Sequence, residues 1–501
     1  MNRYLIQIII PLLFCIPAAY AQDLERDYVL KTAQTITYVD QHQADVWPGF
    51  HISATPTILH FDDTGHLYAY DFTPKNSQWQ KIIVNDTAIN FLAKDEYKLK
   101  GETYDFNVPI DDQSSYIVGQ PFDENTPQDT TKNMFLFAHE RFHMYQVYES
   151  KRPQPTRSLF DGHNQLTNVK LSYLEMKAYD VYLRNKFEKA EDALKDAVAV
   201  HQYRESLLNK DSLAYEQDFE TIEGTAAYVG WKSLNLSDDE YIQRVISWQQ
   251  TSTCNSMTNL SDIQSCLYNS WFYYTGGAAG RALDQKMTSS SWKTAAEIQG
   301  KPLDSVLQEY YHMSLEEAKI RTEKAMQNSD YSYNQIDQAM DAALNPYLNE
   351  MAQQVNAYKL EPGIELQINL GQGYSPEHSD KSYIINTNLE LLTNVSDDSQ
   401  SDDNTLEIHY KNIPLFYNAI SLRVIPEEYW QKFKISAETK ITLDNSNDTA
   451  GNYISNNKDL PFHRLIIENS NVVIKLDHVN GRLTTVDGAL KLKIISETTK
   501  E

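Results

Sequence analysis

The spacing of apolar residues changes twice along the chain. In residues 50–120 apolar and polar positions alternate or gather in short β-rich runs, such as HISATPTILHF and QKIIVND, which predict strands. In residues 130–357 apolar side chains recur three and four positions apart, which predicts helices. Beyond Gly363 short strand-like runs return, separated by Asn, Asp, Ser and Gly. The pattern predicts an α+β protein with an N-terminal mixed β region, a mainly helical middle and a C-terminal β-sandwich-like domain.

The helical region divides into several expected helices. Residues 170–208 predict two long helices or one broken helix, and further helices fit Leu213 to Leu234 and Ser270 to Met287. A last amphipathic helix, Asn334 to Tyr358, is expected to kink or split at Pro346.

Hairpin turns are expected at three places in the β regions. Asp62-Asp63-Thr64-Gly65 separates two N-terminal strand-like runs, Asn480-Gly481 is a strong hairpin signal, and Asp487-Gly488 is a second possible one near the C-terminus.

The first 21 residues have the features of a secretory signal peptide. Arg3 is the only charged residue before Asp23, Leu5 to Ala19 form an apolar core, and Ala19-Tyr20-Ala21 is an A-x-A cleavage site. We expect an exported protein, periplasmic or extracellular, with no membrane span after the signal is removed.

Because a chain of 501 residues needs more than one core, we expect four segments: a signal peptide (1–21), a β-rich region (22–129), a helical domain (130–360) and a β domain (361–501).

The cysteines and the charge narrow the chemistry. Cys254 and Cys266 are the two cysteines beyond the signal peptide, and in an exported chain they most simply form one disulfide that closes a polar loop. The net charge of −25 argues against nucleic-acid binding, which requires a basic surface.

Residues 139–143 read His-Glu-Arg-Phe-His. On a helix His139 and His143 lie one turn apart on the same side, so both imidazoles can reach one metal ion, and Glu140 can contact a water molecule held by that ion. The surrounding stretch from Thr130 to Tyr148 contains no Pro or Gly and is apolar on all sides. It therefore predicts a buried helix in which the histidines and the carboxylate need partners.

A catalytic zinc ion needs a third protein ligand and an open fourth position. Glu223 is the best candidate, because Gly224 beside it would let this helix come close to the histidine helix. Glu220, one turn earlier on roughly the same face, could orient a ligating imidazole from outside the ligand shell. The roles of the two glutamates could be exchanged.

A helix with HExxH followed by a helix with Glu-Gly-x-x-x-Tyr resembles the gluzincin class of zinc metallopeptidases, to which thermolysin and the M1-type aminopeptidases belong. The run YYTGGAAGRALDQ, residues 273–285, is similar to a segment of the glycyl aminopeptidase-like gluzincins. The resemblance covers about residues 130–290. It implies a zincin-like catalytic domain that binds Zn²⁺ through His139, His143 and Glu223, with Glu140 as general base.

The implied reaction is hydrolysis of a peptide or protein substrate by a zinc-activated water molecule. A second donor should stabilise the oxyanion. Tyr274 is our first candidate and Tyr273 the alternative. Arg281 shares roughly the same helix face as Tyr274, although a salt bridge is its commoner role.

Two other functions stay open from the sequence. One is a non-catalytic binding or surface-interaction protein on a metallopeptidase scaffold, whose C-terminal domain, residues 363–501, binds a partner or substrate. The other is a zinc amidase that acts on a non-protein amide. The intact Glu140 favours an enzyme, because a structural zinc site has no use for a base.

Overall fold

The structure is a computed structural model. It describes the following residues: 25–62, 64–84, 87–95, 97, 99, 105–120, 130–149, 165–251, 254, 262–263, 266, 271–287, 290–369, 379, 381–386, 389–400, 406–417, 430–444, 446–455, 459–486 and 488–494. The expected signal peptide and the strand-like run at 419–425 lie outside these residues. The chain forms two compact units, the first from residues 1–153, 170–206 and 217–336 and the second from 154–169, 207–216 and 337–501.

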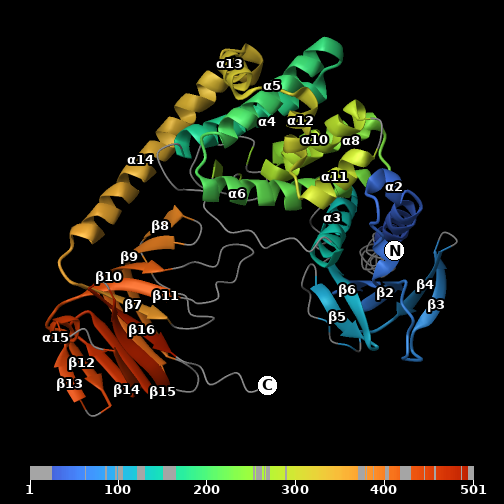
Figure 1. The fold of residues 1–501 in the computed structure, drawn as a ribbon. Helices are drawn as coiled ribbons and strands as arrows, with labels where there is room; N and C mark the ends of the chain where they lie inside the picture. The colour runs from blue at the N-terminus through green and yellow to red at the C-terminus, as the bar shows by residue number, and fades with distance from the viewer. Residues whose placement is uncertain are drawn as a thin grey trace, which may run out of the picture. The chain divides into compact units, whose positions relative to one another are not determined.

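A six-stranded sheet lies near the N-terminus of the first unit (Figure 1). A helix over residues 25–41, α2 (Gln43–Val46) and the 3-10 turn η1 (Ile52–Ala54) precede it. The strands are β1 (Thr57–Phe61), β2 (His66–Tyr70), β3 (Gln80–Val84), β4 (Thr87–Leu92), β5 (Asp105–Ile110) and β6 (Gln113–Gln120). Their order is β3-β4-β2-β1-β6-β5, and β1 pairs with β6 in parallel. Phe61 pairs with His66, so the first expected hairpin turn is confirmed.

The elements between residues 130 and 331 are helical, and several of them begin or end where the apolar spacing predicts. They are α3 (Thr130–Glu149), α4 (Gln165–Arg184), α5 (Phe187–Glu205), α6 (Lys210–Phe219), the π-helical turn η2 (Glu220–Gly224), α7 (Thr225–Lys232), α8 (Asp238–Thr251), α10 (Trp271–Lys286), α11 (Ser291–Gln299), α12 (Leu303–Tyr311), α13 (Leu315–Met326) and the short 3-10 turn η4 (Ser329–Tyr331). Residues 170–208 form two helices, α4 and α5. The single helix expected from Leu213 to Leu234 is instead α6 and α7 joined through the π-helical turn.

The long helix α14 (Tyr333–Leu360) runs without a break through Pro346. The expected split is therefore wrong. A proline removes one backbone hydrogen bond, and this loss does not end a helix whose turns are intact on both sides.

The second unit carries a ten-stranded sheet. Its elements are β7 (Ile364–Asn369), β8 (Lys381–Asn386), β9 (Leu389–Gln400), β10 (Leu406–Tyr417), β11 (Trp430–Ile435), β12 (Lys440–Leu443), β13 (Ser446–Thr449), α15 (Ala450–Ser455), β14 (Asp459–Glu468), β15 (Val472–Val486) and β16 (Ala489–Ile494). The strand order is β13-β12-β14-β15-β16-β7-β11-β10-β9-β8, and β15 also pairs with β10. The pairings close a ring of β15, β16, β7, β11 and β10, whereas a sandwich would have two separately paired sheets. The expected C-terminal β region is therefore confirmed, but its strands do not form the expected sandwich.

One of the two C-terminal hairpin expectations is wrong. Asn480-Gly481 lies inside β15, where Gly481 pairs with Phe462 of β14. A Cβ on Gly481 would lie 2.2 Å from the Phe462 ring, so the glycine is required by close packing and not by a turn. Val486 pairs with Ala489, so the hairpin lies between these two residues, where the other signal predicts it.

Among the described residues, no helix combines the length and the apolarity needed to cross a lipid bilayer.

Candidate metal centre

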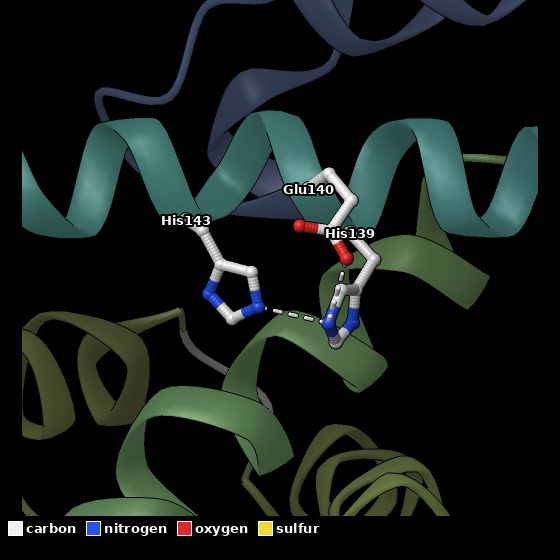
Figure 2. Close-up of side chains that lie close together, drawn as sticks. All are labelled: His139, Glu140 and His143. Carbon is white, nitrogen blue, oxygen red and sulfur yellow. Dashed lines mark hydrogen bonds and ion pairs between the residues drawn. The ribbon is translucent and has the colours of Figure 1, made fainter. Parts of the chain in front are cut away.

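Helix α3 brings two imidazoles together on one side. Its apolar residues pack on all sides, with Met134, Phe135, Phe137, Ala138, Phe142 and Met144 all buried. His139 and His143 are 0% and 7% exposed, and their Nε2 atoms lie 2.9 Å apart (Figure 2). The one-turn spacing expected from the sequence therefore produces one common point for both rings.

Glu223 supplies the third donor atom at this point. Its Oε2 lies 3.1 Å from His139 Nε2 and 3.3 Å from His143 Nε2, and the residue is 2% exposed. Ligands held at about 2.0–2.1 Å from a tetrahedral zinc ion lie about 3.3 Å from one another. The observed separations are within a few tenths of an ångström of that value, and two imidazole nitrogens with one carboxylate oxygen are a zinc donor set.

The protonation of the histidines suits a metal ligand. The Nδ1 of His143 donates to Oε1 of Gln146 at 2.8 Å, which leaves the Nε2 lone pair of a neutral ring directed at the centre. Burial and the neighbouring His143 lower the pKa of His139. The His139 ring is thus disposed to be neutral, the form that binds a metal ion.

Gln146 links the two halves of the centre. While its oxygen accepts from His143, its Nε2 donates to Oγ1 of Thr225 at 2.7 Å and to the carbonyl of Ile222 at 3.1 Å. One amide therefore ties a histidine on α3 to the turn that carries Glu223. Sequence reasoning missed this residue, and the only available signal was its place one turn after His143 on a buried helix.

Stacking orients the His139 ring. Tyr273 lies parallel to it, with centroids 4.6 Å apart and planes at 16°, and Trp248 continues the stack at 5.5 Å. Among the described residues, the buried Nδ1 of His139 has no hydrogen-bond partner. On its Nδ1 side this imidazole is therefore held by ring contacts and not by a hydrogen bond, in contrast to His143.

Two close helix contacts position the turn η2 and helix α7. Gly230 lies against Phe135 of α3, where an added Cβ would be 2.8 Å from the ring. Gly224 instead faces Gly276 of α10, with an expected Cβ separation of 3.4 Å from its Cα. The glycine that contacts α3 is Gly230, about two turns after Gly224. The proposal that Gly224 allows approach to the histidine helix is therefore wrong.

Glu140 lies at the rim of the centre. Its Oε1 is 4.0 Å from His139 Nε2, and its side chain is 20% exposed (Figure 2). A carboxylate at this place can contact both solvent and a molecule beside the three donor atoms.

The other candidates lie elsewhere. Tyr274 is 1% exposed. Burial and the charge of Asp180 raise the pKa of its hydroxyl, and Arg184 acts in the opposite direction. No hydrogen bond recorded for the described residues joins it to the histidines. Arg281 makes a two-pronged salt bridge with Asp238, at 2.9 and 2.7 Å.

Glu220 does not contact the ligating imidazoles as expected. It lies 3.2 Å from Arg204 and 3.6 Å from His201. The π-helical turn separates it from Glu223, because a wider turn of about 4.4 residues puts positions three apart on different sides.

Cys254 and Cys266 are paired as expected. Their Cα atoms lie 4.7 Å apart, and both residues are buried.

Comparison of the chain with known protein families, curated proteins and solved structures found no match.

Replacing Gln146 by Leu is expected to weaken zinc binding about 10–100-fold, because it removes the hydrogen bonds that orient His143 and the turn of Glu223. Chelator competition measures this affinity. Gln146→Glu still accepts from His143 but cannot donate to Thr225, so its affinity should fall between the two. Equal affinity for all three proteins would show that Gln146 does not position the ligands.

Proposed function

We propose that this chain is an exported zinc metallopeptidase of the gluzincin type, with a zincin-like catalytic domain that hydrolyses peptide bonds. The convergence of His139, His143 and Glu223 from two distant segments carries the proposal. Three buried atoms with lone pairs meet within 3.3 Å, and a shared cation is the simplest way to satisfy them. The HExxH sequence adds a carboxylate at the edge of the same centre.

A bound zinc ion would supply Lewis acidity, which lowers the pKa of a water molecule toward neutrality and polarises a peptide carbonyl. His139, His143 and Glu223 would hold it. Glu140 takes the proton from the attacking water and returns it to the leaving amine. The partial exposure of Glu140 suits this exchange, whereas the three ligands are almost fully buried.

The direct test is chelator-sensitive hydrolysis. Protein loaded with zinc should cleave a mixture of fluorogenic peptides, lose this activity with a chelator and regain it on addition of zinc. Bound zinc without cleavage of any peptide would favour the binding protein, and cleavage restricted to non-protein amides would favour the amidase.

Tyr273 is our candidate for the hydroxyl that stabilises the oxyanion, because its ring stacks directly on a ligating imidazole. Tyr273→Phe keeps the ring stack and removes only the hydroxyl. We expect kcat to fall about 100-fold with little change in KM.

Tyr274→Phe is the matched control. Its hydroxyl lies in the field of Asp180 and Arg184, so kcat should stay within about twofold of the wild-type value. Loss of activity in Tyr274→Phe with normal activity in Tyr273→Phe would reverse the assignment.

A further inference from the structure

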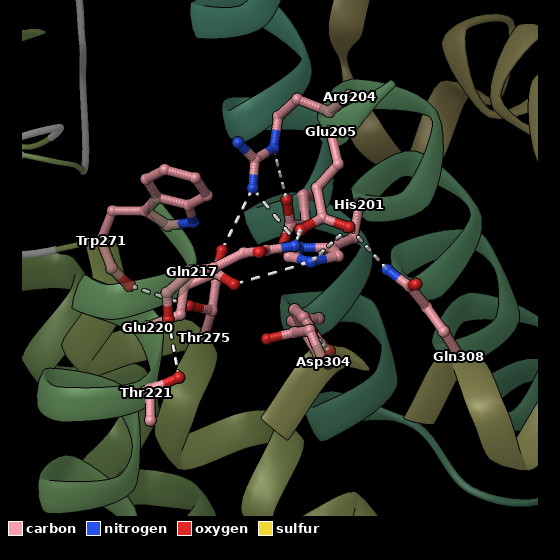
Figure 3. A network of polar contacts seen from close by, with 12 residues as sticks. His201, Arg204, Glu205, Gln217, Glu220, Thr221, Trp271, Thr275, Asp304 and Gln308 are labelled. Atoms are coloured by element: carbon pink, nitrogen blue, oxygen red, sulfur yellow. Dashed lines mark hydrogen bonds and ion pairs between the residues drawn. The ribbon is translucent and has the colours of Figure 1, made fainter. Parts of the chain in front are cut away.

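A second group of polar side chains is buried behind the turn that carries Glu223. His201 and Glu205 lie one turn apart on α5, and Glu220 comes from η2 (Figure 3). His201 is 0% exposed and Glu220 3%, while the Glu205 side chain is 12% exposed. Each of the three offers one atom, and these atoms lie within 4.8 Å of one another.

The contacts of His201 resemble those of a metal ligand. Its Nδ1 donates to Oε1 of Glu175 at 3.1 Å, and a carboxylate on the far nitrogen is the usual way in which a ligating imidazole is oriented. Its Nε2 points between Oε2 of Glu220 at 3.6 Å and Oε2 of Glu205 at 3.7 Å. Among the described residues, neither this Nε2 nor Oε2 of Glu220 has a hydrogen-bond partner.

Arg204 contacts other atoms of this group, so His201 Nε2 and Glu220 Oε2 stay available to a metal ion. Arg204 contacts Oε2 of Glu175 at 3.0 Å and Oε1 of Glu220 at 3.2 Å, and its guanidinium lies 4.2 Å from the centroid of the Trp271 ring. The second oxygen of Glu220 faces His201 instead. Glu205 is held through its other oxygen by Gln217 at 2.8 Å, and Gln308 donates to its Oε2 at 3.2 Å.

The group has an excess of buried negative charge. Four carboxyl groups, those of Glu175, Glu205, Glu220 and Asp304, share one guanidinium and one imidazole. Buried charge without compensation is costly. Either protons or a divalent cation must balance the charge.

We propose that His201, Glu205 and Glu220 form a second, buried metal site, distinct from the centre on α3. Two tetrahedral ligands that are 3.6–3.7 Å apart correspond to metal–ligand bonds of about 2.2 Å, at the upper end of the range for zinc and oxygen. One imidazole nitrogen and two carboxylate oxygens suit zinc or a similar transition metal better than calcium. Glu175 is the positioning residue for His201.

The site joins α5 to the π-helical turn through Glu220, which lies three residues before Glu223. A cation held there would stabilise the segment that presents Glu223. The proposal itself rests on the group around His201 and does not require that the first centre be catalytic.

The test is a count of tightly bound zinc per chain, by atomic emission after zinc loading and exhaustive dialysis of the full chain. Wild-type protein should retain about two ions, since each site has three protein ligands. Glu205→Gln, which preserves side-chain shape, and the double variant H139Q/H143Q should each retain about one. Glu188→Gln, which changes an exposed carboxylate on the same helix α5, should retain both.

The outcomes separate the two proposals. If wild-type protein binds one ion, which H139Q/H143Q loses and Glu205→Gln keeps, the second site is refuted and the proposed peptidase stands. If that one ion instead depends on Glu205, the second site stands and the proposed function fails. Circular dichroism of each variant checks folding, and a folded wild-type chain with no bound zinc refutes both sites and shows that protons balance the buried charge.

Discussion

Replacing Glu140 by Gln is expected to reduce kcat for peptide hydrolysis by about 10²–10⁴-fold while zinc stays bound. The amide cannot accept the proton of the attacking water, yet it has nearly the same volume as the carboxylate. The three zinc ligands, His139, His143 and Glu223, are unchanged. Steady-state kinetics and the metal content of the same sample measure the two effects together.

An exposed glutamate serves as control for this substitution. Glu316 lies exposed in the first turn of α13, and Glu316→Gln should leave kcat unaltered. Turnover by Glu140→Gln at the wild-type rate would refute the assignment of the base. Loss of zinc together with activity would place Glu140 among the ligands.

The contact between the π-helical turn and α10 should be very sensitive to one methyl group. A Cβ on Gly276 would lie 2.2 Å from the Cα of Gly224 and 2.4 Å from its carbonyl oxygen. Backbone atoms cannot rotate away, so Gly276→Ala must push the turn of Glu223 aside. We expect a loss of about 3 kcal/mol in the free energy of unfolding, together with weaker zinc binding. Chemical denaturation and chelator competition measure these effects.

The opposite glycine provides a matched control. A Cβ on Gly224 would lie 3.4 Å from Gly276 Cα, which is ordinary contact, so Gly224→Ala should change stability by less than about 1 kcal/mol. Equal effects of the two substitutions would contradict the packing of these helices.

The helix of the HERFH run could be predicted because its signals are local. Apolar residues on all sides and the absence of Pro and Gly over 130–148 predict a buried helix, and α3 extends from Thr130 to Glu149. The one-turn spacing of His139 and His143 then follows from helix geometry alone. The position of Glu223 beside them also agrees with the expectation, although the reason offered for it, a close approach at Gly224, does not.

The rest of the centre depends on geometry that spacing does not contain. An α-helix would put Glu220 and Glu223 on similar faces, about 60° apart, but the π-helical turn η2 directs them to different groups. The choice between Tyr273 and Tyr274 depends in the same way on how α10 is rotated against α3. Gln146 is important only because Thr225 and Ile222 lie opposite it, and such contacts between distant segments leave no local pattern.

The C-terminal region shows the same division between local and distant causes. Asn480-Gly481 and Asp487-Gly488 are both hairpin signals, yet only the second is a turn. Pairing of β15 with β14 and β16 extends the strand through the first. Packing of Phe462 over Gly481 explains the glycine there.

The central claim is that His139, His143 and Glu223 hold one zinc ion. Anomalous diffraction from crystals of zinc-loaded protein, recorded on both sides of the zinc absorption edge, tests it most directly. We expect a peak about 2.0–2.2 Å from Nε2 of each histidine and from Oε2 of Glu223. Crystals of active protein with no zinc peak between these three atoms would contradict the account.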